Sequence, residues 1–285
     1  MASSLISRPK QSAVLTGGRA PQNSSRRTML MGCPVDLLTS HQLLGELAHA
    51  IDTQSGPKII QFINGNKIAQ VRQRPDMGHI MWRANYALVD GQPLLPLGRL
   101  LGVKIPERID GVGLMSKLLK MADERRYSVY LLGAKQEIVE TCVQKIQRDY
   151  PNVRIAGYRN GYFTKEETGD MVRQIRESRC DILFLGMGSP MKEHFADRYG
   201  SELGATVIQG VGGSFDVMAD LVKRAPVWVQ RIGMEWAFRV AQEPRRMFWR
   251  YATTNASCLW AFTCAFVGPR GQRGNPGQFP GSKGL

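Results

Sequence analysis

The stretch Tyr86–Gly91, with the sequence YALVDG, decides how the rest of the chain is interpreted. Four mostly apolar residues are followed by an acid and a glycine. A buried strand of a parallel sheet delivers a carboxylate to the carboxyl edge of the sheet in this way, and open α/β sheets bind ligands at that edge. Asp90 is therefore the first candidate for a chemically active group. The alternative is that Asp90 and Gly91 only form the turn that follows a strand.

The segment before this strand ends in a second polar residue. Residues 58–64, KIIQFIN, have the pattern of a strand that ends at Asn64. Two short helices, predicted at 67–74 and 76–84 and divided by a proline, follow it. The predicted unit is β-α-α-β, and parallel strands joined in this way bring their carboxyl ends to the same edge. We therefore expect Asn64 to lie beside Asp90.

The remaining sequence alternates between strand and helix patterns. Further strands are predicted at 128–133, 154–158, within 181–190 and within 206–216, and further helices at 114–126, 135–149 and 165–178. Such alternation is typical of a doubly wound, mostly parallel α/β sheet of the Rossmann-like kind. From residue 226 onward only helical patterns follow, which we interpret as a C-terminal helical appendage.

Composition divides the chain into four segments. They are a basic N-terminal extension without ordered structure at 1–30, an α/β domain at 31–222, the helical appendage at 223–267 and a disordered Gly/Pro-rich tail at 268–285. The net charge of +14 is concentrated in the two ends and the appendage, so the α/β body is nearly neutral. This distribution favours an anionic partner at the C-terminal end, either an acidic lipid surface or a phosphorylated ligand.

Several kinds of site are not indicated by the motifs. The five cysteines are scattered, without a CxxC pair or a histidine at ligand spacing, so zinc and a disulfide framework are not predicted. The glycines do not fit GxGxxG and there is no P-loop, which argues against a nicotinamide cofactor. No Asp-x-Asp pair is present to hold a divalent ion on a diphosphate. No apolar stretch approaches the ~20 residues needed to cross a bilayer.

The candidate chemistry therefore belongs to carboxylates and arginines. Asp90, Asp110 and Asp216 lie at or near predicted strand ends, and a partly buried carboxylate can act as a base at neutral pH. The appendage carries Arg239, Arg246 and Arg250 at near-helical spacing, and guanidinium groups match phosphate oxygens. The alternative for the appendage is a helical hairpin with packed aromatic residues and solvated arginines.

With these residues assembled, the chain resembles the WecG/TagA/CpsF family, glycosyltransferase family 26, from about residue 32 to residue 266. The resemblance is carried by FIN at 62–64, YALVDG at 86–91, IPERIDGVG at 105–113, LGMGSPMKE at 185–193, VGGSFDVMAD at 211–220 and KRAPVWVQRIGMEWAFRVAQEPRRMFWRY at 223–251. The last block, with its RAP, EW-x-x-R and EPRR elements in order, is long and specific.

The resemblance implies an activity and partners. The family consists of inverting, metal-independent transferases of the GT-E type, without a cofactor, that act in bacterial exopolysaccharide, capsule or cell-wall polymer synthesis. They move a sugar from a UDP-sugar donor to a polyprenyl-diphosphate-linked glycan acceptor. It also implies that the appendage contacts the anionic membrane surface, so we expect peripheral association with the cytoplasmic face of the plasma membrane.

The resemblance also assigns roles to residues. It makes Asp90 the general base and places Asn64, Gly91, Arg108 and Asp216 in the substrate pocket. Three arginines of the appendage, Arg239, Arg246 and Arg250, match positions that close over the site and meet the diphosphate.

Two positions depart from the family pattern. Phe62 stands where several members have threonine, and Met191-Lys192 replaces the usual Lys-Gln. The donor is therefore left open among a hexose, its N-acetylated form and a uronic acid. Lys192 is a candidate cation for a phosphate or carboxylate.

Two other functions are kept as alternatives. A nucleic-acid-binding protein could use the Arg/Trp-rich appendage, although the neutral body argues against it and no nucleic acid is expected. A member of the family that has lost catalysis could serve as an assembly subunit of the same pathway. The presence of Asp90, Asn64 and Asp216 argues against this second alternative.

Overall fold

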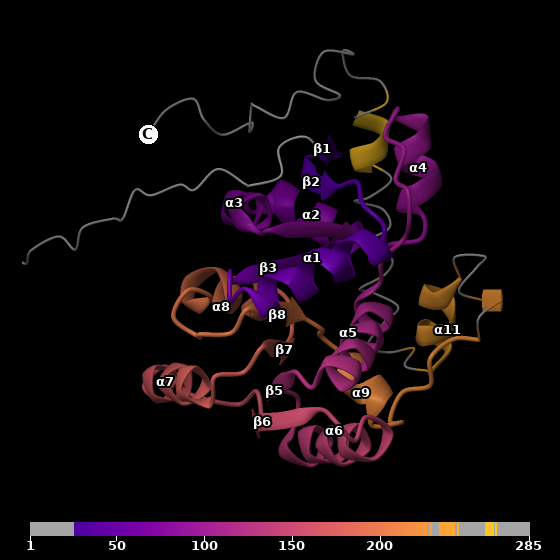
Figure 1. The fold of residues 1–285 in the computed structure, drawn as a ribbon. Helices are drawn as coiled ribbons and strands as arrows, with labels where there is room; N and C mark the ends of the chain where they lie inside the picture. Colours follow the sequence, from indigo (N-terminus) through magenta and orange to yellow (C-terminus); the bar gives the residue numbers. More distant parts are fainter. Residues whose placement is uncertain are drawn as a thin grey trace, which may run out of the picture.

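The computed structural model of the chain describes residues 26–226, 228–229, 234–242, 244, 260–264 and 266. Its centre is a six-stranded sheet in which all neighbouring strands are parallel (Figure 1). The strand order is β4-β3-β8-β7-β5-β6. The strands are β3 (Lys58–Ile63), β4 (Tyr86–Val89), β5 (Ser128–Gly133), β6 (Arg154–Arg159), β7 (Ile182–Gly186) and β8 (Val207–Gly210).

Helices cover both faces of this sheet. One face packs against α1 (Ser40–Asp52), α5 (Gly111–Arg125), α6 (Gln136–Asp149) and α9 (Ser214–Met218). The other face packs against α2 (Gly65–Gln73), α3 (Pro75–Arg83), α7 (Thr168–Ser178) and α8 (Met191–Tyr199). A short helix, α4 (Leu94–Leu100), follows β4, and α11 (Glu235–Gln242) is the described helix at the start of the appendage. The doubly wound α/β fold predicted from the sequence is confirmed.

Most strands of the sheet are buried along nearly their whole length because helices cover both faces of the sheet. Every residue of β4, β5 and β8 is buried, and four of the five in β7 are. Continuous apolar runs of this kind are what parallel sheets between two helical layers require. Asn64 and Asp90 follow directly after the buried ends of β3 and β4, and this places them at the carboxyl edge.

An N-terminal hairpin corrects the predicted domain boundary. Residues Arg27–Leu30 form β1, which pairs antiparallel with β2 (Cys33–Asp36), although the sequence pattern predicted that 27–30 belong to the disordered extension. The hairpin is held by Arg27, whose side chain is 1% exposed and pairs with Asp36 at 2.7 Å. Arg27 also donates to the carbonyl oxygen of Ala84 just before β4. A charged residue at a buried position is stable here because it is paired and hydrogen-bonded.

The structure describes only parts of the appendage. It comprises the segment through Pro226, α11, a helical turn at 260–264 and a few single residues. The positions of Arg246 and Arg250, and the predicted tail at 268–285, lie outside the described residues. None of the helices in the described part of the chain has the length and apolar character that a membrane span requires.

Candidate active site at the carboxyl edge of the sheet

Asn64 and Asp90 are neighbours at the carboxyl edge, as the sequence predicted. Ile63 and Val89, the last residues of β3 and β4, are paired in register. The Asn64 side-chain oxygen accepts the backbone N–H of Lys67 at 3.1 Å and so caps α2. This cap orients the amide nitrogen toward Asp90, to which it donates at 3.4 Å. A helix cap thus fixes the first polar neighbour of the carboxylate.

Gly91 allows the two strand ends to approach each other. A Cβ atom at this position would lie 3.3 Å from the Cα of Asn64 and 3.4 Å from the side chain of Leu94. The backbone N–H groups of Asp90 and Gly91 both donate to the carbonyl oxygen of Ile63. Asp90 and Gly91 are therefore fastened to the end of β3, and this holds the Asp90 carboxylate at the sheet edge. The turn follows at residues 92–93.

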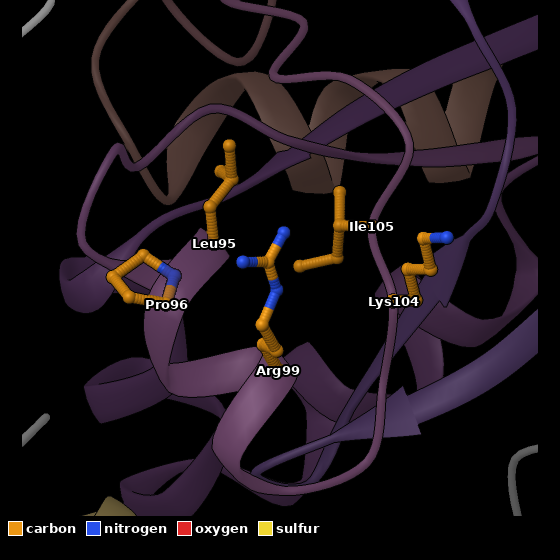
Figure 2. A pocket seen from close by; sticks show the side chains of 5 residues that line it. All are labelled: Leu95, Pro96, Arg99, Lys104 and Ile105. Carbon is orange, nitrogen blue, oxygen red and sulfur yellow. The ribbon is translucent and has the colours of Figure 1, made fainter.

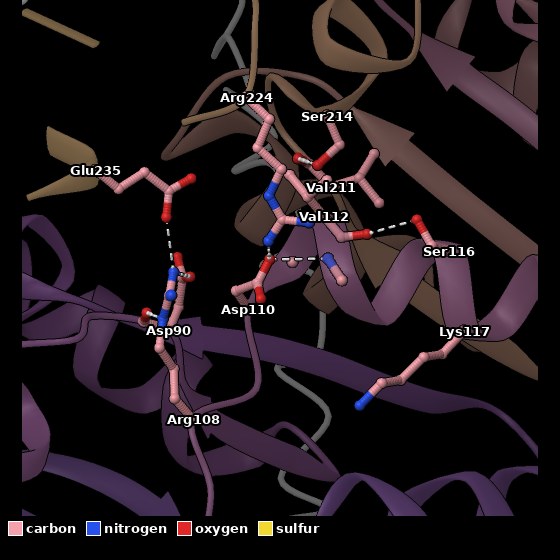
Figure 3. A network of polar contacts seen from close by, with 12 residues as sticks. Asp90, Arg108, Asp110, Val112, Ser116, Lys117, Val211, Ser214, Arg224 and Glu235 are labelled. Atoms are coloured by element: carbon pink, nitrogen blue, oxygen red, sulfur yellow. Dashed lines mark hydrogen bonds and ion pairs between the residues drawn. The ribbon is translucent and has the colours of Figure 1, made fainter. Parts of the chain in front are cut away.

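Arg108 connects Asp90 to the appendage (Figure 3). Its Nε donates to the backbone carbonyl of Asp90 at 2.6 Å, and its terminal nitrogen lies 3.7 Å from the Asp90 carboxylate. The same nitrogen pairs with Glu235, the first residue of α11, at 3.0 Å. The Asp90 side chain keeps 29% of its surface exposed, whereas that of Arg108 is 16% exposed. The carboxylate is thus reachable by a ligand, while the guanidinium is held from two sides.

The surroundings of Asp90 make its carboxyl group more basic than usual. Burial raises the pKa of Asp90 above its ordinary value, and the charges of Asp110 and Glu235 add to that rise. The charge of Arg108 and the hydrogen bond from Asn64 act in the opposite direction, but the net shift is upward. A carboxylate with a raised pKa is a better proton acceptor at neutral pH than a solvated one.

A second ion pair ties the start of the appendage to the same edge. Asp110 caps α5 by accepting the backbone N–H of Gly113 at 2.8 Å. The same carboxylate oxygen accepts from Arg224, in the segment after α9, at 2.7 Å (Figure 3). The pairs Arg224–Asp110 and Arg108–Glu235 therefore hold two points of the C-terminal segment against the loop before α5.

Lys192 belongs to a buried charge cluster, which we name the Lys67–Glu193–Lys192 cluster. One oxygen of Glu193 pairs with Lys67 at 2.8 Å and with Lys192 at 2.7 Å. The side chains of Glu193 and Lys67 are 1% and 4% exposed, and Lys192 is 15% exposed. Burial pushes the pKa of Glu193 upward, but the two lysines more than offset it, so the pKa of Glu193 is lowered. Burial lowers the pKa of Lys67 despite its carboxylate partner.

This cluster lies at the strand ends next to Asp90. Lys67 is on α2, which Asn64 caps, and the stem of Lys192 lies against Gly210, the last residue of β8. Since β8 neighbours β3, Lys192 reaches the same carboxyl edge. Its ammonium group is neutralised in part by Glu193, a pairing that was not predicted from the sequence.

The remaining predicted site residues, Asp216 and the appendage arginines, lie on α9 or in the appendage. Asp216 lies in the first turn of α9, which packs on α5 and α6. Burial raises the pKa of the Cys142 thiol on α6 to about 12, and the charge of Asp216 adds to that rise. Arg239 is part of α11, but its side chain is outside what the structure describes, as are Arg246 and Arg250. The structure thus brings Asn64, Asp90, Gly91 and Arg108 together.

Three residues at this edge, Glu235, Glu193 and Lys67, were not predicted from the sequence. Glu235 is the acid of the EW-x-x-R element and Glu193 is the acid of the MKE element. Neither sequence pattern indicates which cation the carboxylate pairs with. Among the described residues, no three His, Cys, Asp or Glu side chains gather in a way that could hold a metal ion. The cations at this edge include Arg108, Arg224 and Lys192.

We expect Glu235→Gln to shift the pH dependence of turnover. Removing this negative charge lowers the pKa of Asp90 and leaves Arg108 freer to pair with Asp90, which lowers it further. If Asp90 must be deprotonated, the acidic limb of the kcat/KM profile moves to lower pH. Glu124→Gln, at an exposed position on α5, is the matched control and should leave the limb in place. If the acidic limb of the kcat/KM profile is unchanged in Glu235→Gln, then Glu235 does not influence the pKa of Asp90.

Comparisons with known proteins identify the family of this chain. The family model described as "Glycosyl transferase WecG/TagA/CpsF family" matches residues 28–272. The chain is 33% identical over 199 residues to an N-acetylglucosaminyldiphosphoundecaprenol N-acetyl-beta-D-mannosaminyltransferase of Bacillus subtilis strain 168, covering 70% of this chain and 76% of that protein. It is also 33% identical over 165 residues to the protein of the same name from Staphylococcus aureus strain MW2, covering 58% and 64%. The chain therefore belongs to the WecG/TagA/CpsF family of glycosyltransferases.

Proposed function

We propose that this chain transfers a sugar from a UDP-sugar to a saccharide carried on a polyprenyl diphosphate, with inversion at the anomeric carbon. Family membership and the names of the relatives, which specify a sugar acceptor on diphosphoundecaprenol, support the reaction class. The observation that carries the proposal is the Asp90 carboxylate, which is partly exposed at the carboxyl edge, has a raised pKa and lies beside Arg108. Open α/β sheets bind their ligands at this edge.

In the proposed step, Asp90 accepts the proton of the acceptor hydroxyl. The hydroxyl oxygen forms a bond to the anomeric carbon of the donor as the bond from that carbon to the diphosphate oxygen breaks. The bonding electron pair leaves with UDP, and the proton stays on the Asp90 carboxyl group. Asn64 holds the carboxylate in one orientation, since its own position is fixed by the α2 cap. General base catalysis of this kind contributes about 10²–10⁴-fold in rate.

The leaving diphosphate is proposed to be neutralised by arginines and not by a metal ion. Arg108 is the described cation beside Asp90, and it is paired with Glu235. Guanidinium groups bind phosphate oxygens through parallel hydrogen bonds. Through their match to the family, Arg239, Arg246 and Arg250 are proposed to meet the diphosphate when the appendage closes over the site. Asp216 is proposed to contact the donor.

The donor sugar is left open within the UDP-sugars. Phe62 is buried and lies next to Gly111 at the start of α5. Several family members have threonine at the position of Phe62. Lys192, in place of the usual glutamine, adds an ammonium group near the end of β8. Both differences lie near the proposed pocket, so the N-acetylmannosamine in the names of the relatives is not carried over. The enzyme is proposed to work at the cytoplasmic face of the plasma membrane, where polyprenyl-linked acceptors are presented.

A transfer assay tests the proposal directly. The purified full chain is incubated with a polyprenyl-diphosphate-linked acceptor and, one at a time, UDP-hexoses, UDP-N-acetylhexosamines and UDP-uronic acids. We expect acceptor-dependent release of UDP with one donor class and a product with inverted anomeric configuration. Absence of UDP release with every donor, together with binding of the acceptor, would favour the assembly-subunit alternative. Tight, strongly salt-dependent DNA binding without UDP affinity would favour the nucleic-acid alternative.

A further inference from the structure

The outer side of α4 and the loop after it form a small basic pocket with apolar walls, which we name the α4 pocket (Figure 2). It has a volume of about 210 Å³ and is lined by Leu95, Pro96, Arg99, Lys104 and Ile105. Figure 2 shows the Arg99 guanidinium lying between Leu95 and Ile105. The pocket combines two cations with apolar walls, and its lining contains no acidic residue.

Arg99 and Lys104 have no carboxylate partner among the residues that the structure describes. This distinguishes them from the arginines at the sheet edge, where Arg108 and Arg224 both form ion pairs. Two cations that share a pocket without a counter-ion repel each other, and an anion bound between them removes that repulsion. The pocket is therefore suited to a negatively charged group such as a phosphate.

Exposed apolar side chains adjoin these cations. Leu100, the last residue of α4, is 62% exposed. The helical turn at 260–264 packs on the same core as α4 through Ala261, and Figure 1 shows it (in yellow) beside α4. Trp260 in this turn is 64% exposed, and Phe266 just after it is 50% exposed. Large apolar side chains next to unpaired cations are typical of a surface that lies in the interface of a membrane.

We propose that the α4 pocket is a docking site for the head group of an anionic phospholipid. The phosphate binds Arg99 and Lys104, while Leu100, Trp260 and Phe266 enter the acyl region beside it. The partner is a bilayer surface, because a soluble phosphate would not need the apolar side chains. This site lies outside the proposed active site around Asp90. It adds α4 to the membrane contact that is expected of the appendage.

Because α4 lies next to Asp90, lipid binding at the α4 pocket would also position the site for the reaction. This consequence rests on the proposed function. α4 begins three residues after Gly91, and its first residue, Leu94, donates its backbone N–H to the carbonyl oxygen of Gly91, next to Asp90. A helix of seven residues is about 10 Å long. Binding of lipid at the far end of α4 therefore holds the Asp90 edge close to the membrane, where the diphosphate of a lipid-linked acceptor lies.

Vesicle co-sedimentation of the full-length protein tests the docking site. Wild type and Arg99→Gln/Lys104→Gln are compared on phosphatidylcholine vesicles with and without phosphatidylglycerol. Each basic residue near an anionic surface contributes about fivefold to binding, so the double variant should bind phosphatidylglycerol vesicles about 25-fold more weakly. Leu100→Ser should weaken binding to both kinds of vesicle. The substituted side chains are exposed, so the melting temperatures of these variants should match that of the wild type.

The matched control removes the same charge elsewhere. Lys165→Gln/Arg173→Gln changes two exposed cations in and just before α7, which lies far from α4 in Figure 1. Its vesicle binding should stay within about twofold of wild type, because surface charges more than a Debye length from the membrane are screened. Equal losses in both double variants, or none in the α4 variant, would overturn the docking site.

A second readout separates this proposal from the proposed function. Transfer to a water-soluble acceptor with a short lipid chain needs the catalytic site but not membrane docking. We expect Arg99→Gln/Lys104→Gln to retain wild-type turnover on the soluble acceptor and to lose turnover on acceptor embedded in phosphatidylglycerol vesicles. If wild type fails with the soluble acceptor while its vesicle binding still depends on Arg99 and Lys104, the proposed function fails and the docking site stands. Loss of turnover on both acceptors would make the α4 residues part of the catalytic site and contradict a docking role.

Discussion

Asp90→Asn is expected to lower kcat by about 10²–10⁴-fold while leaving the affinity for UDP nearly unchanged. The amide has the shape of the carboxyl group and can still accept from Asn64, but it cannot take a proton from the acceptor hydroxyl. Loss of a positioned general base costs a factor of this size. Single-turnover transfer on the lipid-linked acceptor measures the rate, and calorimetric titration with UDP measures the binding.

The same substitution should not destabilise the protein. The pKa of Asp90 is raised in the folded state, which means that folding disfavours the ionised carboxylate. At pH values above that pKa the wild type carries this cost, whereas the neutral amide introduced by Asp90→Asn does not. Arg108 keeps its bond to the backbone carbonyl of residue 90 and its ion pair with Glu235. We therefore expect a variant that unfolds at the same or a higher urea concentration at neutral pH.

The combination of these two results is what distinguishes a base from a structural acid. A carboxylate retained for stability would give a variant that loses both folding free energy and rate. Asp170→Asn, at an exposed position on α7, is the control and should alter neither property. Near wild-type kcat in Asp90→Asn would remove Asp90 from the role of base and leave only the turn interpretation of YALVDG.

The fold was predictable wherever a strand was long, apolar and closed by a polar residue. The unit from β3 through α2 and α3 to β4 follows from its pattern, because both strands are mostly apolar and each is followed directly by a polar residue. The β1–β2 hairpin was not predicted, since its key residue is a charged arginine in a segment that has the composition of a basic extension. α8 was also missed because it is mostly polar and buries only Glu193, Phe195 and Ala196.

The site was predictable only where its residues follow from the order of the strands. Asn64 and Asp90 follow adjacent strands, so topology alone predicts that they meet. The pairing of Arg108 with Glu235 depends on how the appendage packs against the sheet edge, which no local pattern encodes. The Lys67–Glu193–Lys192 cluster likewise joins α2 to α8, two helices far apart in sequence. Charges that neutralise each other across elements become visible only in three dimensions.

Glu193→Gln is expected to destabilise the fold by about 3–5 kcal/mol at neutral pH, because removing one partner of a buried ion pair leaves the remaining charge desolvated and uncompensated. The substitution leaves Lys67, which is 4% exposed, and Lys192 facing each other without the carboxylate that both contact. Urea unfolding followed by circular dichroism gives the difference in free energy, provided that the slope of the transition is the same for both proteins.

The pH dependence of this loss identifies its electrostatic origin. In wild type the pKa of Glu193 is lowered in the folded state. Its contribution to folding stability is therefore present above the unfolded-state pKa and is lost as pH falls through the folded-state pKa. In Glu193→Gln the dominant group is Lys67, whose pKa is already lowered by burial and falls further without its partner. Its buried charge lowers the folding stability by the full amount at low pH. This loss of stability shrinks as pH rises from the folded-state pKa of Lys67 toward its unfolded-state pKa. The variant should therefore gain more stability in alkaline solution than wild type does.

A double variant tests whether the loss comes from the buried charge or from packing. Lys67→Met/Glu193→Gln removes the buried cation together with its partner, while Lys192, at 15% exposed, can still reach water. Replacing a buried ion pair by neutral groups of similar volume is often close to neutral in stability, so this variant should recover most of what the single substitution loses. A double variant as unstable as Glu193→Gln would attribute the effect to the shape of the site. In that case the ion pairs of the cluster would not be what holds α2, and with it the Asn64 cap, at the carboxyl edge of the sheet.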